Sequence, residues 1–157
     1  MGAFKFFLFA SIMLLSHTQD TDDRYENMGW EVLMNDVRTR YRYDSSYNAF
    51  VPIPRFGREV RALEGTEITL KGFFLPADVS GNVIVLSFMP MAMCFFCSGA
   101  GIESVVEIHS TTQHQSRFRR LRTDDFIEIR GKLQLNADDL EHLIYILKDA
   151  ELVKVYR

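Results

Sequence analysis

The sequence predicts a mostly β protein built as a small antiparallel, OB-like barrel, of the oligonucleotide/oligosaccharide-binding type. Thirteen Phe and six Tyr in 157 residues favour strands over helices. Residues 126–135 alternate apolar and polar side chains, which is typical of a strand with one buried face. Strands and helices do not alternate along the chain, so a parallel sheet is not expected.

Three further segments fit the same barrel. Residues 68–75 are rich in strand formers and end at Pro76, and the pair Ser80-Gly81 marks a turn. The apolar run 83–88 fits a strand buried on both faces. Residues 102–108 and 152–156 complete the set of predicted strands.

One amphipathic helix is predicted late in the chain. Asn136 and Asp138 are natural N-caps, and apolar residues follow them at helical spacing: Leu140, Leu143, Ile144 and Leu147. This helix precedes the last strand rather than following the third, so the barrel is predicted to be OB-like only. Residues 30–40 have helical spacing for about two turns, and prolines end any helix by position 52, which predicts an N-terminal helical or irregular extension.

The domain organisation is predicted from the N-terminus onward. Residues 1–18 have a short positive start at Lys5 and an apolar run too short to span a bilayer, which predicts a cleaved signal peptide. Residues 19–29 are predicted as a polar tether and 30–157 as a single OB-like domain. We therefore expect an exported protein, periplasmic or extracellular, with no stable membrane insertion after cleavage.

Charge and motifs limit the function classes. The formal net charge of −3 supplies no general attraction for a polyanion, so nucleic acid is not an expected partner. The basic cluster 117–122 is predicted as a solvated loop, and His142 as an exposed residue. The sequence carries no phosphate-binding loop and no catalytic triad spacing, which favours a binding protein over an enzyme.

The chemistry concentrates in a Cys-x-x-Cys loop at Cys94 and Cys97. Gly99 and Gly101 allow the backbone to fold tightly around the two sulfurs. Three interpretations stay open: a structural disulfide in a ligand-binding module, a thiol-disulfide oxidoreductase, and a metal site.

The oxidoreductase interpretation would use Cys94 as the attacking thiolate and Cys97 as the resolving thiol. Thioredoxin-like domains carry a cis-proline after this motif. Here all four prolines precede the loop, which weakens this interpretation.

The metal interpretation takes two forms. His109 and His114 would complete a four-ligand zinc site with the two cysteines. Alternatively, Met91 and Met93 beside the cysteines form a soft donor set suited to Cu(I). Zn and Cu are therefore the candidate cofactors.

The loop also resembles a family of bacterial exported proteins that carry a domain of unknown function. The resemblance rests on these features: Trp30, Pro54-Arg55-Phe56-Gly57, Leu63-Glu64-Gly65, Cys94-Phe95-Phe96-Cys97, Gly101-Ile102-Glu103-Ser104-Val105, the stretch 130–133 and the stretch 135–139. It implies that Glu103 belongs to the loop together with the glycines, and that components of a transport system are candidate partners. Ser98 and Ile102 stand where relatives more usually have Gly and Pro, and the histidines are not part of the pattern.

Overall fold

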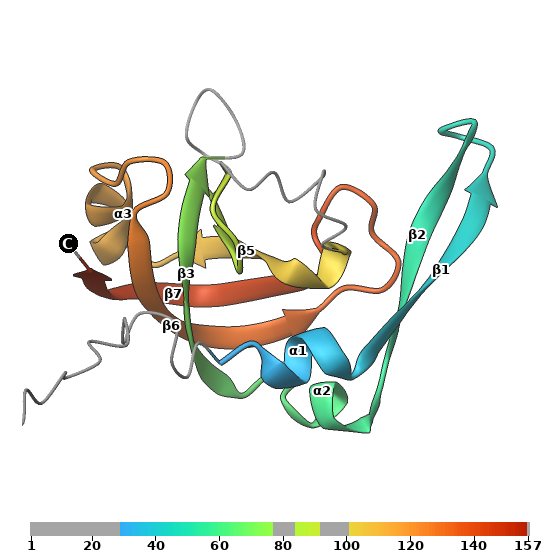
Figure 1. The fold of residues 1–157 in the computed structure, drawn as a ribbon, viewed down its shortest axis with the longest axis horizontal. Helices are drawn as coiled ribbons and strands as arrows, with labels where there is room; N and C mark the ends of the chain where they lie inside the picture. Colours follow the sequence, from blue (N-terminus) through green and yellow to red (C-terminus); the bar gives the residue numbers. More distant parts are fainter. Residues whose placement is uncertain (1–28, 77–83, 92–100, 157) are drawn as a thin grey trace, which may run out of the picture.

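A closed five-stranded barrel and a projecting two-stranded hairpin make up the computed structural model, which describes residues 29–76, 84–91 and 101–156 (Figure 1). The elements in chain order are α1 (Glu31–Asn35), β1 (Val37–Asp44), β2 (Ala49–Phe56), α2 (Arg58–Ala62), β3 (Glu67–Pro76), β4 (Ile84–Ser87), the 3-10 turn η2 (Ile102–Ser104), β5 (Val105–Ser110), α3 (Thr112–Phe118), β6 (Phe126–Leu135) and β7 (Tyr145–Tyr156).

The barrel closes in the order β3-β4-β5-β7-β6, with β6 pairing back to β3. All neighbours are antiparallel except β5 and β7, which run parallel. Counted within the barrel, the strands follow the order first, second, third, fifth, fourth, and α3 follows the third strand. This topology is that of an OB barrel, and it confirms the predicted fold class.

The strand predictions in the barrel are confirmed. The alternating segment 126–135 is β6, and its inward residues are buried except for the half-buried Leu135, while most of its outward residues are exposed. Segment 68–75 lies in β3, and the apolar run 83–88 contains β4, whose four residues are all buried. The predicted strand at 102–108 begins later, at Val105, because residues Ile102–Ser104 form the turn η2.

The predicted late helix is wrong. Residues 136–144 form a loop, and β7 starts at Tyr145. The physical reason is that consecutive apolar residues 145–147 are all buried at the start of the fifth barrel strand, whereas a helix would bury only one stripe. The helix associated with the barrel is α3, which follows the third barrel strand. It includes Arg117 and Phe118 of the basic cluster that was predicted as a loop, and Phe118 is completely buried.

The N-terminal extension is also different from the expectation. Helical spacing over 30–40 gives only the five-residue α1, after which β1 and β2 pair along their whole length. In β1, arginines alternate with Thr and Tyr rather than with aliphatic residues. The sequence therefore shows no apolar alternation there, and the strand was not predicted.

A single core fills the barrel and extends under α1 and α2. Leu33 of α1 and Val60 of α2 are fully buried in the same cluster as barrel residues such as Leu70 and Ile129. Two hydrogen bonds fasten α1 to the barrel: Trp30 Nε1 donates to the Lys71 carbonyl at 2.7 Å, and the Tyr145 hydroxyl donates to the Leu33 carbonyl at 2.7 Å. Burial raises the pKa of Tyr145 far above its usual value, so this hydroxyl stays a donor.

The predicted signal peptide and most of the predicted tether lie outside the described residues. Within the described ranges, none of the helices has the length and apolar character needed to cross a membrane.

We expect Gly131→Ala to destabilise the barrel. An added Cβ would lie 2.8 Å from the Lys148 carbonyl oxygen and 2.9 Å from Leu147 Cγ of the neighbouring β7, so the two strands would have to separate. Overpacking of this kind costs about 1–3 kcal/mol of unfolding free energy, measurable by urea denaturation. The exposed neighbour Gln134→Ala is the control, and equal stability of the two variants would contradict this prediction.

Candidate metal centre

The candidate site lies on the outer face of β5. Because side chains alternate along a strand, Val106 and Ile108 point into the core cluster while Glu107 and His109 point outward. The same outer face carries a small second apolar cluster formed by Leu75, Val85, Val105 and Leu143. Glu107 is therefore a carboxylate set among apolar neighbours, and it is only 7% exposed.

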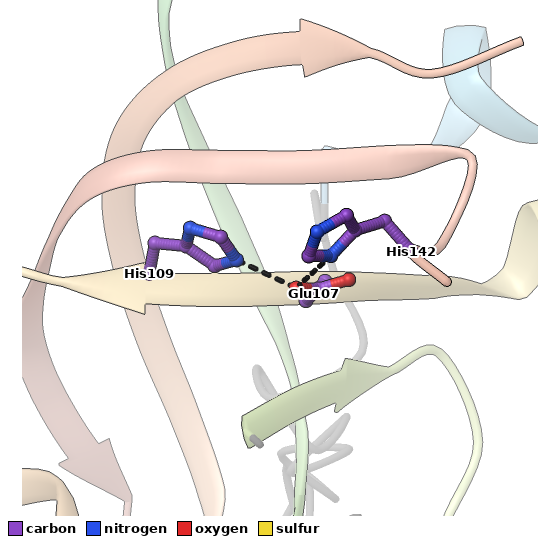
Figure 2. Close-up of side chains that lie close together, drawn as sticks. All are labelled: Glu107, His109 and His142. Atoms are coloured by element: carbon purple, nitrogen blue, oxygen red, sulfur yellow. Dashed lines mark hydrogen bonds and ion pairs between the residues drawn. The ribbon is translucent and has the colours of Figure 1, made fainter. Parts of the chain in front are cut away.

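Glu107 accepts three hydrogen bonds there, and Figure 2 shows the two that come from His109 and His142. His109 Nε2 lies 2.6 Å and His142 Nδ1 lies 2.8 Å from its Oε1 atom. The backbone N–H of Leu143 donates to its Oε2 atom at 3.0 Å. The two imidazole rings meet edge to face with centroids 5.8 Å apart.

These contacts decide the charge of Glu107. Burial on its own would raise the pKa of this carboxyl, since it disfavours the charged form. The hydrogen bonds from His109, the Leu143 N–H and His142 outweigh burial, and the net effect lowers the pKa of Glu107. A carboxylate anion therefore faces the two imidazoles.

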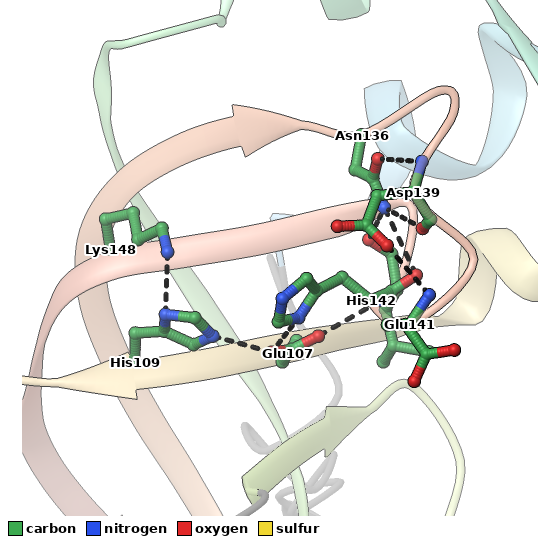
Figure 3. Close-up of polar contacts among 8 residues, drawn as sticks. Glu107, His109, Asn136, Asp139, Glu141, His142 and Lys148 are labelled. Carbon is green, nitrogen blue, oxygen red and sulfur yellow. Dashed lines mark hydrogen bonds and ion pairs between the residues drawn. The ribbon is translucent and has the colours of Figure 1, made fainter.

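Lys148 of β7 fixes the tautomer of His109 (Figure 3). Its Nζ atom lies 2.7 Å from His109 Nδ1. An ammonium group has donors only, so Nδ1 must be the acceptor and the ring proton sits on Nε2. His109 thus donates that proton to Glu107 and is neutral.

The loop 136–144 that carries His142 is held in shape by Asn136 (Figure 3). The Asn136 side-chain oxygen accepts from the N–H groups of Asp138 and Asp139, and its amide nitrogen donates to the carbonyls of Asp139, His142 and Leu143 at 2.7–3.2 Å. Asp139 in turn accepts the Glu141 N–H at 2.9 Å. This local network places His142 above β5 without any regular secondary structure.

Glu107, His109 and His142 together form a group that fits a metal ion. One ligand atom from each lies within 4.8 Å of the others, and among the described ranges no second group of His, Cys, Asp or Glu meets that condition. A tetrahedral zinc site with bonds of about 2.1 Å needs ligand atoms about 3.4 Å apart. The ligand atoms here are separated by 2.6 Å and 2.8 Å in the two hydrogen bonds and by no more than 4.8 Å overall, so small shifts of the side chains reach that spacing. Two imidazoles and one carboxylate form a donor set typical of zinc, and it leaves a fourth position open.

The residues predicted from sequence are placed differently. His109 belongs to this group, while His114 lies in α3, where its Nδ1 accepts the Leu152 N–H at 2.9 Å and has Arg117 at 3.4 Å. Met91 is 47% exposed, and its backbone N–H donates to Asp124.

Gly101 directly precedes η2, and Glu103 is the middle residue of this turn. The Glu103 carboxylate occupies the space that a Cβ at position 101 would need. Cys94, Cys97, Met93 and Gly99 lie outside the described residues.

Sequence reasoning missed Glu107 and the role of His142. His142 is exposed as predicted, but it lies in a loop and is bound to Glu107. The available signal was the Glu-x-His pair at 107 and 109, because residues two apart on a strand share a face. No spacing rule could add His142, which is 35 residues from Glu107.

His142 also lines a cavity of about 290 Å³ between the loop 136–144 and the hairpin. Its walls are largely apolar and include Val51, Pro52, Pro54, Ile102 and Leu140. The hydroxyl of Tyr47, in the hairpin turn, donates to Glu141 at 2.8 Å and ties the two sides together.

Comparison with protein-family models finds no family that matches this chain, and comparison with curated proteins finds no significant match.

Proposed function

We propose that this chain is an exported accessory protein that binds Zn²⁺ through Glu107, His109 and His142. The observation that carries the proposal is the convergence of one buried carboxylate and two imidazoles on the outer face of β5. Nitrogen and carboxylate donors suit Zn²⁺ better than Cu(I), which prefers sulfur. The sequence resemblance to a family of exported proteins, which implies components of a transport system as partners, supports export and the accessory role.

Binding of Zn²⁺ would replace the two hydrogen bonds from the imidazoles to Glu107, and each ring proton would move to the other ring nitrogen. In the metal-free protein, His109 and His142 direct one N–H each at Glu107 Oε1. A Zn²⁺ ion would occupy the space of those protons and accept the lone pairs of both ring nitrogens and the carboxylate. With three protein ligands and one open position, the site suits a metal that is taken up and passed on.

The cysteine pair is proposed as a separate thiophilic site. Cys94 and Cys97 offer two sulfur ligands three positions apart, with Met91 and Met93 as neighbouring soft donors. Such a set would take Cu(I) or a second Zn²⁺ when both thiols are reduced. The disulfide and oxidoreductase alternatives use the same two sulfurs in their oxidised form or during thiol exchange.

We expect each of the three proposed ligands to be needed for Zn²⁺ binding. The test uses a Cys94→Ser/Cys97→Ser background and three single variants: Glu107→Gln, His109→Gln and His142→Gln. Each should weaken Zn²⁺ binding by at least about tenfold, because it removes one of the three protein ligands. Isothermal titration calorimetry measures the affinity. His114→Gln is the matched control, since its Nδ1 is already bonded to the backbone of β7.

A purely structural network would give another result. Glu107→Gln would then lower the stability of the metal-free protein, while the parent background would bind no Zn²⁺ at micromolar concentration. That pair of results would rule out the metal site and leave a hydrogen-bonded clamp between β5 and the loop.

We expect Lys148 to weaken Zn²⁺ binding at His109. Zn²⁺ on His109 Nε2 requires the ring proton to move to Nδ1, which faces the Lys148 ammonium, so two donors would meet. Lys148→Gln removes the charge and offers a carbonyl acceptor, and we expect Zn²⁺ affinity to rise by about three- to tenfold. Lys132→Gln is the charge control, because Lys132 is the register partner of Lys148 on β6. A lower affinity for Lys148→Gln would contradict this arrangement.

The two proposed sites should be separable by mutation. Reduced protein should bind Cu(I) in competition with a chromophoric chelator, and Cys94→Ser/Cys97→Ser should lose that binding while it keeps Zn²⁺ at Glu107. If the reduced protein binds no Cu(I) and its cysteine pair has a reduction potential below about −300 mV, the pair is a structural disulfide instead.

A further inference from the structure

The hairpin of β1 and β2 is a second surface with its own chemistry. It forms a two-stranded sheet separate from the barrel, and it projects beyond it (Figure 1). The two strands cross in that view, and toward the tip of the hairpin β2 lies nearer the barrel than β1. Residues 37–56 contain four Arg and one Asp, a local charge of +3 in a chain whose net charge is −3.

One face of the hairpin carries all four arginines. Residues directly opposite in an antiparallel pair share a face, so the face follows from the register. Its members are Arg38, Arg40 and Arg42 of β1 and Arg55 of β2, with Val51 and Ile53 between them. Arg38 stands directly opposite Arg55, an arrangement of like charges that is unfavourable without an anion nearby.

These arginines are unpaired within the described part of the chain. All four are exposed, and none of the ion pairs or hydrogen bonds found there involves their side chains. Asp44, on the same face at the end of β1, already accepts the Ser46 N–H at 2.9 Å. The face is therefore a row of positive charges ready for an acidic partner.

The opposite face is aromatic. Tyr41 is 72% exposed, Tyr43 is 53% exposed and Phe50 is 70% exposed. Tyr43 and Phe50 are register partners and contact each other edge to face at 5.6 Å. Tyr and Arg are the residue types that most often dominate the energy of protein interfaces.

The outer edge of β1 offers backbone groups as well. Strand β1 pairs with β2 alone, and none of the further backbone hydrogen bonds of the described residues uses residues 37–44. No proline interrupts β1, whereas Pro52 and Pro54 remove two N–H groups from β2. A strand edge of this kind is a template for an added strand.

We propose that the β1 edge binds an extended segment of a partner protein in which acidic residues alternate with apolar ones. A strand added at this edge reaches both faces of the hairpin, because its own side chains alternate. Its acidic residues would lie beside Arg38, Arg40 and Arg42, which repeat about every 6.7 Å along the strand. Its apolar residues would lie beside Tyr41 and Tyr43.

The placement of arginines on one face of the hairpin and aromatic side chains on the other favours an added strand over a flat polyanion. A membrane surface or a nucleic acid backbone laid on the hairpin meets one face, and the arginines and the aromatic side chains lie on opposite faces. Only an added strand uses the charges, the aromatic groups and the free backbone groups together.

The test uses fluorescence anisotropy with a labelled peptide of about ten residues in which Glu alternates with Val. Full-length mature protein should bind it, and Arg40→Glu with Arg42→Glu should weaken binding at least about tenfold, because each reversal turns attraction into repulsion. Arg119→Glu with Arg120→Glu, two exposed arginines beyond α3, is the matched control and should have little effect.

Four kinds of probe decide the mode of binding. Peptides N-methylated at alternate residues block one edge of the added strand, and one of the two methylated versions should lose binding. A peptide of the same composition with its Glu residues clustered should bind more weakly. Vesicles of phosphatidylglycerol and an oligothymidylate should bind less well than the alternating peptide.

Several outcomes would overturn the proposal. These are no binding of the alternating peptide, equal binding of both methylated versions, or stronger binding of the vesicles or the oligonucleotide. The result is independent of the zinc proposal, since Glu107→Gln leaves the hairpin unchanged and should retain peptide binding.

Discussion

The parallel pairing of β5 with β7 is the constraint on which the candidate site depends. Parallel strands start at the same end of a sheet, so the loop 136–144 that leads into β7 arrives beside the beginning of β5. Glu107 is the register partner of Ile146, close to that loop. The pairing therefore brings His142 to a carboxylate from which it is distant in sequence, and it places Lys148 beside His109 on the next strand.

The energetics of this face follow from one buried charge. Between the apolar Val85 and Ile146, an unpaired carboxylate would be costly to bury. The lowered pKa of Glu107 indicates that its hydrogen bonds more than compensate for burial. Each hydrogen bond to a charged group contributes about 1.5–3 kcal/mol, so the loop 136–144 gains stability by donating two of them. The network that holds the loop is thus the same network that assembles the proposed ligands.

The barrel was predictable from sequence because its signal is local. The alternation in β6 and the apolar run that contains β4 each report burial directly. The late helix was mispredicted because Leu140, Leu143, Ile144 and Leu147 satisfy helical spacing by coincidence. What decides the structure there is the Asn136 network and the need for a fifth strand, and both are visible only in three dimensions.

The site was less predictable than the fold for a related reason. His109 was predicted from sequence as a possible ligand, and it belongs to the group at Glu107, but its predicted partners were chosen by distance along the chain. The actual neighbours come from β5 itself and from a loop beyond β6, and their meeting depends on barrel closure. Sequence spacing identifies ligands on one turn or one strand, as in a Cys-x-x-Cys loop, and it fails for ligands that converge through topology.

The hairpin and the proposed metal site are connected only weakly, through the loop 136–144. Tyr47 in the hairpin turn donates to Glu141, in the loop that also carries His142. That hydrogen bond is exposed, so water replaces either partner at little cost, and the hairpin can move without pulling on the metal ligands. His142 is held instead by Glu107 and by the Asn136 network, which do not involve the hairpin. Under the two proposals, binding of a strand at β1 and binding of a metal at Glu107 should therefore be independent, because the two surfaces share no strong contact.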